Sequence, residues 1–422
     1  MGRGIIAERH RSAATHTVRS GPEAPTRVLF VNTRHAIGAD VAVHLMLVRN
    51  LSEHGCDVHL ATAAGAAEAM VRDSPGVTIR VLHLGYELAG RARLRRMLAM
   101  VGNALVLPLA LLRLAWWVRA IDIEVIHSTE RPRDALVSTT LALITGRTAV
   151  IHCHNKAGAS FGRVTNWGLR RSHAVIAISE FVRHSLVATG LPGERVFTAH
   201  NAVDPERFDP AHRSSGAPRL RLGIAPEAPL VGVVGRVMVW KGQLELVRAM
   251  AEVRRHVPDA RLLIAGEACV MGGEGTGYEA RVQRCVEQLG LATCVHRAGR
   301  VENVADLYAQ LDVVCVPSYE EPFGLVLVEA MAAGRAIVAS ASGAIPEIVR
   351  HGVEALLVPP RDPGPLAEAV LTLLEDPGLR KDLGARARAR ALSRFSPARQ
   401  AEEVATIYRS FRAARVRERT GG

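Results

Sequence analysis

The stretch that decides the fold is Val316-Pro-Ser-Tyr-Glu-Glu-Pro-Phe-Gly-Leu-Val-Leu-Val-Glu-Ala-Met-Ala-Ala-Gly334. An apolar run at residues 311–316 leads into it and stops at Pro317, which predicts a buried strand that opens into a loop. Residues 325–333 are mostly apolar and contain no Pro or Gly, which predicts a buried helix that ends at Gly334. The stretch therefore predicts one strand–loop–helix unit of an α/β protein.

Two acids in this stretch form a candidate ligand site. Glu321 precedes the expected helix, and a rise of about 1.5 Å per residue places Glu329 roughly 7 Å along its axis from Gly324. Between them, the free N–H groups of the first helical turn favour an anion. A ligand with hydroxyls at both ends and a phosphate in the middle, such as a nucleotide sugar, suits this spacing. The alternative is a surface loop with solvated acids, but the placement directly after a strand favours a site.

These residues resemble the donor-site signature of retaining GT-B glycosyltransferases of family 4 type (glycosyl transferases group 1). Ten positions lie in register with that signature: Ser318, Glu321, Phe323, Gly324, Leu325, Glu329, Ala330, Met331, Ala332 and Gly334. The resemblance covers about residues 27–415. It implies an α/β fold of two Rossmann-like parallel-sheet domains that face a central cleft, with a C-terminal helix that crosses back to the first domain.

The composition bounds the classes of protein that the chain can belong to. Its 422 residues suit two domains, and a hydrophobic content of 48% argues against a disordered protein. The formal net charge of +12 implies attraction to polyanions such as nucleotides or phospholipid surfaces. Nucleic acid is not an expected partner, because aromatic residues are only 4% and no zinc-finger or helix-turn-helix pattern is present.

Cysteine usage and the N-terminus indicate the compartment. The six cysteines form no CxxC pair and several lie in apolar strands, which is typical of a reducing cytosol. The first 25 residues are rich in Arg and lack an apolar run, so we expect no signal peptide. The expected location is cytoplasmic, with peripheral contact at the inner face of the membrane as an open alternative.

Alternating strand and helix patterns predict parallel sheets whose ligands lie at the carboxyl ends of the strands. We expect a disordered tail at 1–26 and a Rossmann-like acceptor-side domain at 27–204. Four prolines mark a linker at 205–227. A Rossmann-like nucleotide-sugar-binding domain is expected at 228–396, followed at 397–415 by the helix that returns to the first domain.

Two cations follow the first expected strand of the second domain. The pattern G-R-x4-K-G is formed by Gly235, Arg236, Lys241 and Gly242. Solvated surface cations are the alternative interpretation. The pattern is similar to the family's pyrophosphate clamp, in which the Arg would bond phosphate bidentately and the Lys would act as a point charge.

A polar loop follows the expected strand at 148–152 and carries His154. A histidine in such a loop is more often structural than functional. The family resemblance implies a His after this strand that faces the donor sugar, for which His154 is the first choice and His152 the alternative.

The chain departs from the family pattern at two positions. Relatives usually have Gly-Gly before the first helix of the first domain, and here Ile37 precedes Gly38. Residues 342–347 resemble the family's G-G-x-P-E turn, but Ala344 stands where the second Gly is usual. At the first position, the loss of a glycine bears on how closely the backbone approaches the donor phosphates.

Residues 91–120 combine an Arg cluster, an apolar run and the pair Trp116 and Trp117. The uncharged run at 97–112 is about 16 residues long, short of the roughly 20 that span a bilayer, and it contains Pro108. Ordinary domain helices, an interfacial helix on an anionic membrane and a true span all remain open.

Carried over by position, the resemblance implies a role for each matched residue. Glu329 would bond the ribose hydroxyls, Glu321 the donor-sugar hydroxyls, and Arg236 and Lys241 the diphosphate. Backbone N–H groups near Phe323, Gly324 and Leu325 would assist, while His154 and the Gly38 loop would close the site. We expect no cofactor and no metal, because fixed cations neutralise the leaving group and the chain has no D-x-D pair.

The expected function is therefore a retaining glycosyltransferase of hexosyltransferase type in polysaccharide or glycolipid biosynthesis. It would move a sugar from a nucleotide-diphosphate sugar, UDP- or GDP-linked, to a hydroxyl of a glycan, a lipid-linked glycan or a small molecule. One alternative is a non-catalytic GT-B-like protein that binds a nucleotide or a partner. Another is a GT-B phosphorylase, whose cofactor lysine cannot be located by spacing.

Overall fold

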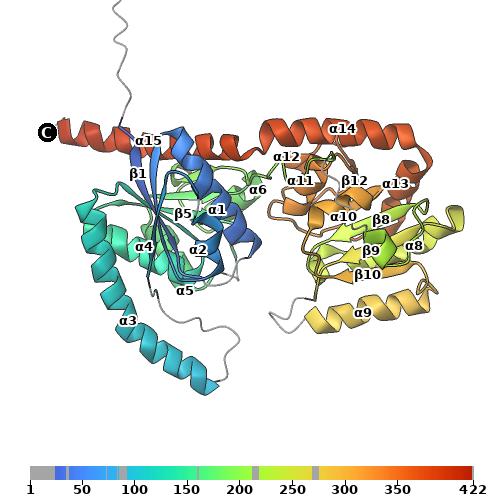
Figure 1. The fold of residues 1–422 in the computed structure, drawn as a ribbon, viewed down its shortest axis with the longest axis horizontal. Coiled ribbons are helices and arrows are strands. Elements are labelled where there is room, and N and C mark those ends of the chain that lie inside the picture. Colours follow the sequence, from blue (N-terminus) through green and yellow to red (C-terminus); the bar gives the residue numbers. More distant parts are fainter. Residues whose placement is uncertain are drawn as a thin grey trace, which may run out of the picture.

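Two parallel sheets, each covered by helices on both faces, lie side by side in the computed structural model of the chain (Figure 1). The structure describes residues 24–34, 38–72, 74–82, 84, 93–158, 161–211, 218–268 and 275–420. Most of the expected tail at 1–26 lies outside the described residues, and so does Ile37. The arrangement confirms the α/β class and the two Rossmann-like domains.

The first domain is built on a seven-stranded parallel sheet. Its strands, in spatial order, are β3 (Val77–Val81), β2 (Cys56–Thr62), β1 (Thr26–Asn32), β4 (Val125–Thr129), β5 (Thr148–Cys153), β6 (Ala174–Ala177) and β7 (Val196–Thr198). Its helices are α1 (Ala39–Leu51), α2 (Ala66–Val71), α3 (Arg93–Ala120), α4 (Pro132–Thr145), α5 (Arg163–Arg171) and α6 (Glu180–Ala188). The central strands are apolar on both faces, as parallel strands covered by helices must be.

The second domain is built on a six-stranded parallel sheet. Its strands, in spatial order, are β10 (Val295–Gly299), β9 (Arg261–Ala265), β8 (Leu230–Val234), β11 (Val313–Val316), β12 (Ala336–Ser340) and β13 (Leu356–Val358). Its helices are α7 (Pro218–Arg221), α8 (Gln243–His256), α9 (Gly275–Gln288), α10 (Val304–Gln310), α11 (Leu325–Ala332), α12 (Ile345–Ile348), α13 (Pro363–Glu375) and α14 (Pro377–Arg394). The predicted strand–loop–helix unit is thus β11, its loop and α11.

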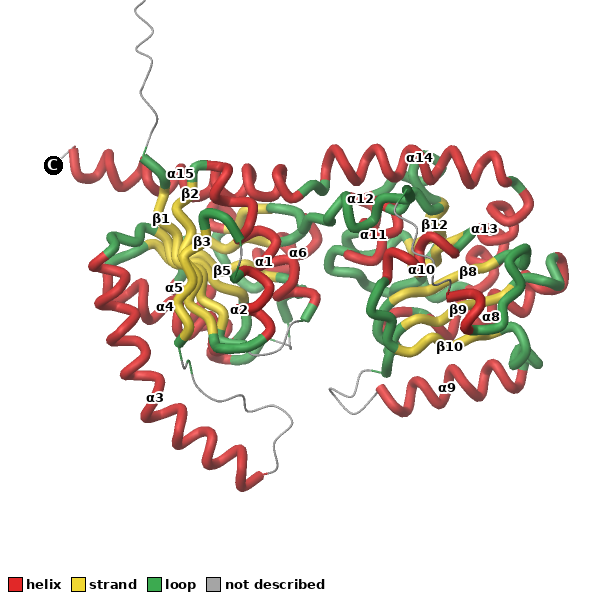
Figure 2. Tube along the Cα trace, in the orientation of Figure 1, coloured by secondary structure: helices red, strands yellow, loops and turns green. Residues whose placement is uncertain are grey.

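Alternation along the strands assigns each face of the first sheet to a set of helices. In β1, Val28 and Phe30 pack in the core that contains α1, whereas Leu29 and Val31 pack in the core of α3 and α4. Figure 2 shows the strands as a layer between these helices. Because successive side chains of a strand point to opposite faces, a single apolar strand supplies both cores.

The last helix, α15 (Pro397–Thr420), crosses from the second domain back to the first (Figure 1). Ala401, Val404 and Tyr408 are fully buried in the same core as α1 and β1. The predicted C-terminal crossing is therefore confirmed, and the helix extends to Thr420 rather than 415.

Helix α3 is one continuous helix that includes Pro108. Its C-terminal part is packed in the first domain, where Leu114 and Val118 are fully buried. Its N-terminal half extends away from the domain body (Figure 2). Within the described residues, Met97–Ala120 is long and apolar enough to cross a membrane by length and composition alone, a test that core helices of soluble proteins also pass.

Candidate donor-binding site

The order of the second sheet determines where a ligand can bind. Strands β8 and β11 are neighbours in the sheet although they are far apart in sequence, so the connections after them diverge to opposite faces. Such a switch point leaves a crevice at the carboxyl ends of the strands. Gly235 and Arg236 follow β8, and the loop with Glu321 follows β11, so both predicted motifs meet at this crevice.

A cavity of about 500 Å³ lies at this point, between the two domains. The second domain lines it with Gly235, Arg236, Trp240, Lys241, Glu321, Pro322, Phe323, Gly324, Leu325 and Val326. The first domain lines it with Arg34, Gly38, Arg131, His154, Asn155, Ile178 and Asn201. Its volume falls within the range of small-molecule sites.

Every predicted site residue except Glu329 is among those lining residues. Four of the lining side chains are Arg or Lys and one is a carboxylate, so the cavity suits an anionic ligand.

Lys241 and Glu321 form an ion pair on the cavity wall. Lys241 Nζ lies 2.6 Å from Glu321 Oε2, and the two side chains are 14% and 7% exposed. Ser318 Oγ donates to the same carboxylate oxygen at 3.0 Å, and the ammonium lies 4.3 Å from the centre of the Trp240 ring. A buried ammonium with this much support has a defined position, so it presents a fixed positive charge to the cavity.

The clamp loop and the β11 loop touch through their backbones. Tyr319 N donates to Trp240 O at 2.7 Å. Gly242 has φ +70°, and a Cβ at this position would lie 2.1 Å from Pro317 O. Only glycine allows that approach, which explains why the G-R-x4-K-G pattern ends in Gly.

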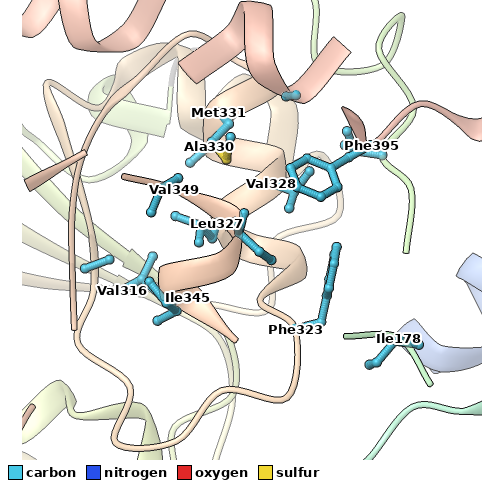
Figure 3. Close-up of a cluster of buried hydrophobic side chains, with 14 of the residues drawn as sticks. Ile178, Val316, Phe323, Leu327, Val328, Ala330, Met331, Ile345, Val349 and Phe395 are labelled. Carbon is cyan, nitrogen blue, oxygen red and sulfur yellow. The ribbon is translucent and has the colours of Figure 1, made fainter. Parts of the chain in front are cut away.

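Phe323 anchors the start of α11. Its side chain is 2% exposed and packs edge-on against Phe395, with ring centroids 5.8 Å apart. Figure 3 shows Phe323 directed into the cluster formed with Leu327, Val328 and Phe395, with Ile178 of the first domain opposite. Phe323 borders the cavity, but its side chain belongs to the core and fixes the position of the loop backbone around it.

The first turn of α11 supplies backbone donors. The helical hydrogen bonds begin with Val328 N donating to Gly324 O at 3.1 Å. The N–H groups of the preceding residues of the turn therefore have no partner inside the helix. Gly324, Leu325 and Val326 line the cavity, so this end of the helix faces the ligand space.

Glu329 lies one turn further along α11; it is half-buried and is not among the residues that line the cavity. Its Oε2 accepts a hydrogen bond from the Tyr308 hydroxyl at 3.0 Å. Burial raises the pKa of Glu329 to about 7, against the opposing influence of Tyr308, Arg207 and Lys241. A carboxyl group with this pKa is poised to lose its proton when a hydrogen-bond donor or a cation approaches.

Of the two candidate histidines, one lines the cavity and the other does not. His154 lines the cavity, and its backbone N donates to Glu130 Oε2 at 3.2 Å. Asn155 Nδ2 donates to the other oxygen of Glu130 at 2.5 Å. His152 is 1% exposed and lies in the core of the first domain. Of the two, His154 is the one in position to contact a ligand.

Four polar lining residues of the first domain were not anticipated from the sequence: Arg34, Arg131, Asn155 and Asn201. Each comes two or three residues after the end of a strand, namely β1, β4, β5 and β7. These positions could have marked the four residues as site candidates in the sequence, because ligands of doubly wound sheets lie beyond the carboxyl ends of the strands.

The turn after β12 packs against the backbone of Glu321. Gly343 has φ +57°, and a Cβ there would lie 2.3 Å from Glu321 O. Ala344 has φ −82°, and its N–H donates to Glu321 O at 2.8 Å. The departure at Ala344 from the family's Gly-Gly is therefore accommodated, since only Gly343 needs to be a glycine.

Comparisons with known proteins agree with this geometry. The family model described as Glycosyl transferases group 1 matches residues 219–390, and the one described as Glycosyltransferase Family 4 matches residues 41–207. The two matches cover most of both domains.

Curated relatives are similar over part of their length. The chain is 35% identical over 238 residues to D-inositol 3-phosphate glycosyltransferase 2 of Catenulispora acidiphila, covering 55% of each chain. It is 31% identical over 264 residues to alpha-maltose-1-phosphate synthase of Mycolicibacterium smegmatis, covering 58% of this chain and 66% of that one. The chain thus spans about half the length of most of the curated relatives that it matches.

Solved structures share the whole fold. Anabaena HepE in complex with UDP is similar with a TM-score of 0.73 and 23% identity, over 91% of this chain and 100% of that one. Sucrose-phosphate synthase of Thermosynechococcus elongatus is similar with a TM-score of 0.71 and 24% identity, over 92% of this chain and 100% of that one. At these identities the likeness establishes the fold.

Proposed function

Because this chain belongs to the group 1 glycosyl transferases with the GT-B fold, we propose that it moves a sugar from a nucleotide-diphosphate sugar to a hydroxyl group with retention of configuration. The observation that carries the proposal is the cavity at the switch point of the second sheet, lined by Arg236, Lys241 and the start of α11. Cations and helix N–H groups on one wall are what a diphosphate requires.

The proposed donor is a UDP-sugar, with a GDP-sugar as the alternative. Anabaena HepE, which has the same fold, is solved with UDP and with UDP-glucose. In this chain Arg236 and Lys241 would hold the diphosphate, and Glu321 would accept hydrogen bonds from the sugar hydroxyls. Glu329 would accept from the ribose, and His154 would contact the sugar from the first domain.

We propose that the transfer needs no metal ion on the diphosphate. In this site the leaving group would be neutralised by Arg236, Lys241 and the N–H groups of α11. Such preorganised charges typically account for about 2.7–4 kcal/mol each when one is removed. Transfer rates should therefore be unchanged, within about twofold, when Mg²⁺ or Mn²⁺ is added or omitted. A requirement for either ion would contradict this part of the proposal.

The proposed acceptor carries an anionic group beside its hydroxyl. Arg34 and Arg131 lie on the first-domain wall of the cavity, opposite the diphosphate clamp. Relatives are named for D-inositol 3-phosphate, which is a phosphorylated polyol. Comparing D-inositol 3-phosphate with myo-inositol as acceptors tests this. Arg131→Gln should lower kcat/KM for an anionic acceptor by at least tenfold without changing donor affinity, and equal use of both acceptors would contradict the proposal.

We propose that the enzyme acts at the inner face of an anionic membrane, which it contacts through the N-terminal half of α3. Among the side chains of this helix that the structure describes, the large exposed apolar ones are Met97, Leu98, Met100 and Val101 in that half, and Leu109, Leu112 and Trp116 further along. Leu114 and Val118, in the C-terminal part of the same helix, belong to the domain core, which favours contact with the membrane surface over a full span.

Donor binding and product formation together test the proposal against a non-catalytic protein. UDP-, GDP- and ADP-glucose are compared by calorimetry and by thermal melting, where a ligand at 100 times its Kd adds about 2.7 kcal/mol of stability. Release of the nucleoside diphosphate in the presence of acceptor is then measured. Binding of a donor without any release, to an acceptor or to water, would favour the non-catalytic alternative.

A further inference from the structure

Three histidines from different elements meet in the core of the first domain, next to His154 but outside the residues that line the donor cavity. His44 comes from α1, His127 from β4 and His152 from β5. They are 7%, 0% and 1% exposed. The proposed glycosyl transfer uses none of them.

Their nitrogen atoms are close enough to share one ion. One ligating nitrogen from each ring can be chosen so that all three lie within 4.8 Å of one another. Some point therefore lies within about 2.8 Å (4.8/√3) of all three atoms. Zinc–nitrogen bonds are about 2.0–2.1 Å, so closure requires movements of only about 0.7 Å for each ring.

The rings leave nitrogens without partners. Both ring nitrogens of His152 and Nε2 of His127 are buried and accept or donate no hydrogen bond. A buried polar atom without a hydrogen-bond partner lowers the stability of the fold by roughly 1–3 kcal/mol. Three such nitrogens in two neighbouring rings therefore need an explanation. A bound cation would satisfy one nitrogen of each ring at once.

His127 also has the outer contact that metal-binding histidines usually have. Its Nδ1 and the Tyr408 hydroxyl of α15 are hydrogen-bonded, which leaves Nε2 for a ligand. An oxygen partner on the second ring nitrogen orients the imidazole and makes it a better donor.

The three candidate ligands are all imidazole rings. Imidazole ligands favour zinc and neighbouring transition metals over Mg²⁺ or Ca²⁺.

We propose that His44, His127 and His152 form a structural site for one divalent transition-metal ion, with zinc as the best match. The ion joins α1, β4 and β5. Through the hydrogen bond between His127 and Tyr408, it also stabilises the packing of α15 on the first domain. It also holds His152, against which the ring of His154 is stacked with centroids 4.8 Å apart. The site is distinct from the donor diphosphate clamp and does not depend on the proposed reaction.

The first test measures metal in the full-length, untagged protein. After dialysis against metal-free buffer, mass spectrometry should find roughly one zinc per chain. A Co²⁺-substituted sample should show the intense visible absorption of a tetrahedral site. Absence of stoichiometric metal, both as purified and after addition of zinc, would overturn the proposal in favour of simple packing of neutral rings.

Variants locate the ion. His44→Gln and His152→Gln should each weaken zinc binding at least tenfold in competition with a chromophoric chelator. Tyr408→Phe, which keeps the buried ring and deletes only the hydroxyl, should weaken it about tenfold. His59→Gln is the matched control, because His59 is a buried histidine of β2 that is not part of the cluster, and it should retain full affinity.

Two further results, one on a variant and one on the wild-type protein, would count against the site. Zinc bound as tightly by His152→Gln as by wild type would place the ion elsewhere in the chain. If that variant fails to fold, the wild-type protein is used instead. Its melting temperature should fall when a strong chelator is added and should recover with zinc. A melting temperature that does not change with chelator would overturn the proposal.

Discussion

Lys241 and Arg236 differ in how the protein holds them, and this bears on what their removal would do. Lys241 is paired with the buried carboxylate of Glu321, so Lys241→Ala also leaves that charge without a partner. Arg236 follows β8 on the cavity wall and has five N–H donors in a planar group. Loss of either cation removes a preorganised charge from the diphosphate position.

We predict that Arg236→Ala and Lys241→Ala each lower turnover 100- to 1,000-fold, the usual effect of deleting one preorganised donor. Arg236→Lys should recover only part of the rate, since an ammonium cannot bond bidentately. Steady-state release of the nucleoside diphosphate is the measurement. Arg255→Ala, at an exposed position of α8, is the control, and turnover within threefold of wild type in both alanine variants would refute the clamp.

The raised pKa of Glu329 makes a prediction about stability and pH. The carboxyl group has a pKa of about 7 in the folded chain, against an ordinary value of 4.5. Folding therefore favours the protonated form, and the associated stability is complete below pH 4.5 and lost as the pH rises to about 7. Because one pKa unit corresponds to about 1.36 kcal/mol, the whole loss is roughly 3 kcal/mol.

Glu329→Gln should remove this dependence, since an amide does not ionise and can still accept a hydrogen bond from Tyr308. Between pH 5 and pH 8 the unfolding free energy of the variant, measured in urea, should rise relative to wild type by roughly 2–3 kcal/mol. Glu375→Gln, at an exposed position, should show no such difference. Parallel pH profiles of wild type and Glu329→Gln would show that the carboxyl group is not perturbed.

Sequence reasoning found the residues that belong to a spaced motif and missed those that do not. Glu321 and Lys241 could be predicted because each lies at a set distance from a strand end within a recognisable pattern. Arg131 and Asn201 come from loops with no such pattern, and their approach to the cavity depends on how two domains dock. The hydrogen bond between Tyr308 and Glu329 also depends on tertiary packing, which sequence spacing does not encode.

At the scale of elements, α3 divides into a half that packs and a half that does not. The packed part also has an exposed face: Trp117 is 6% exposed and contacts the ring of His59, whereas Trp116 is 68% exposed. An exposed apolar surface next to several arginines is the pattern of a helix that lies on an anionic membrane.

We predict binding to vesicles that contain anionic phospholipid at low salt, weaker at high salt and absent with neutral lipid. Leu98→Glu combined with Leu109→Glu should reduce binding at least tenfold in sedimentation assays. Arg113→Glu should reduce it severalfold, because each basic residue near such a surface contributes about 1 kcal/mol. Leu392→Glu, an exposed leucine of α14, is the control and should bind normally. No sedimentation with anionic vesicles at low salt would reject the membrane role.

The elements themselves were largely predictable, and α3 shows the limit. Buried parallel strands such as β11 are continuous apolar runs bounded by Pro or Gly, so their positions can be read from the sequence. Helices α13 and α14 begin at Pro363 and Pro377, as their prolines indicate. The apolar run of α3 is short for a span, but it fits both a core helix and an interfacial helix, and only tertiary packing distinguishes these two.

At the scale of the whole molecule, the cavity exists because the domains are held together by polar contacts as well as by α15. Glu347 of the second domain accepts hydrogen bonds from Glu180 N at 2.9 Å and Phe181 N at 3.2 Å, at the start of α6. Ser179 Oγ donates to Pro322 O at 2.6 Å. These contacts lie beside the site, so the donor wall and the acceptor wall are positioned relative to each other.

That arrangement determines which groups can act on the acceptor hydroxyl. Inversion would require a general base within hydrogen-bond reach of the acceptor, on the side opposite the leaving group. Among the lining residues of the described cavity, the one carboxylate is Glu321, which is paired with Lys241 and bonded by Ser318. His154 lies on the wall that we assign to the donor sugar. The remaining group that can take the proton is the departing diphosphate, on the face from which it leaves.

We therefore predict that the product keeps the anomeric configuration of the donor. The diphosphate, held by Arg236 and Lys241, would accept the acceptor's proton while a short-lived oxocarbenium-like species is attacked from the same face. Proton NMR of the first-formed product from an α-linked donor measures the outcome through the coupling of the anomeric proton. An α-linkage is expected. A β-linkage would mean that a base acts from the opposite face, and His154→Gln would then be the first variant to examine, since His154 and Glu321 are the residues of the cavity wall that can act as a general base.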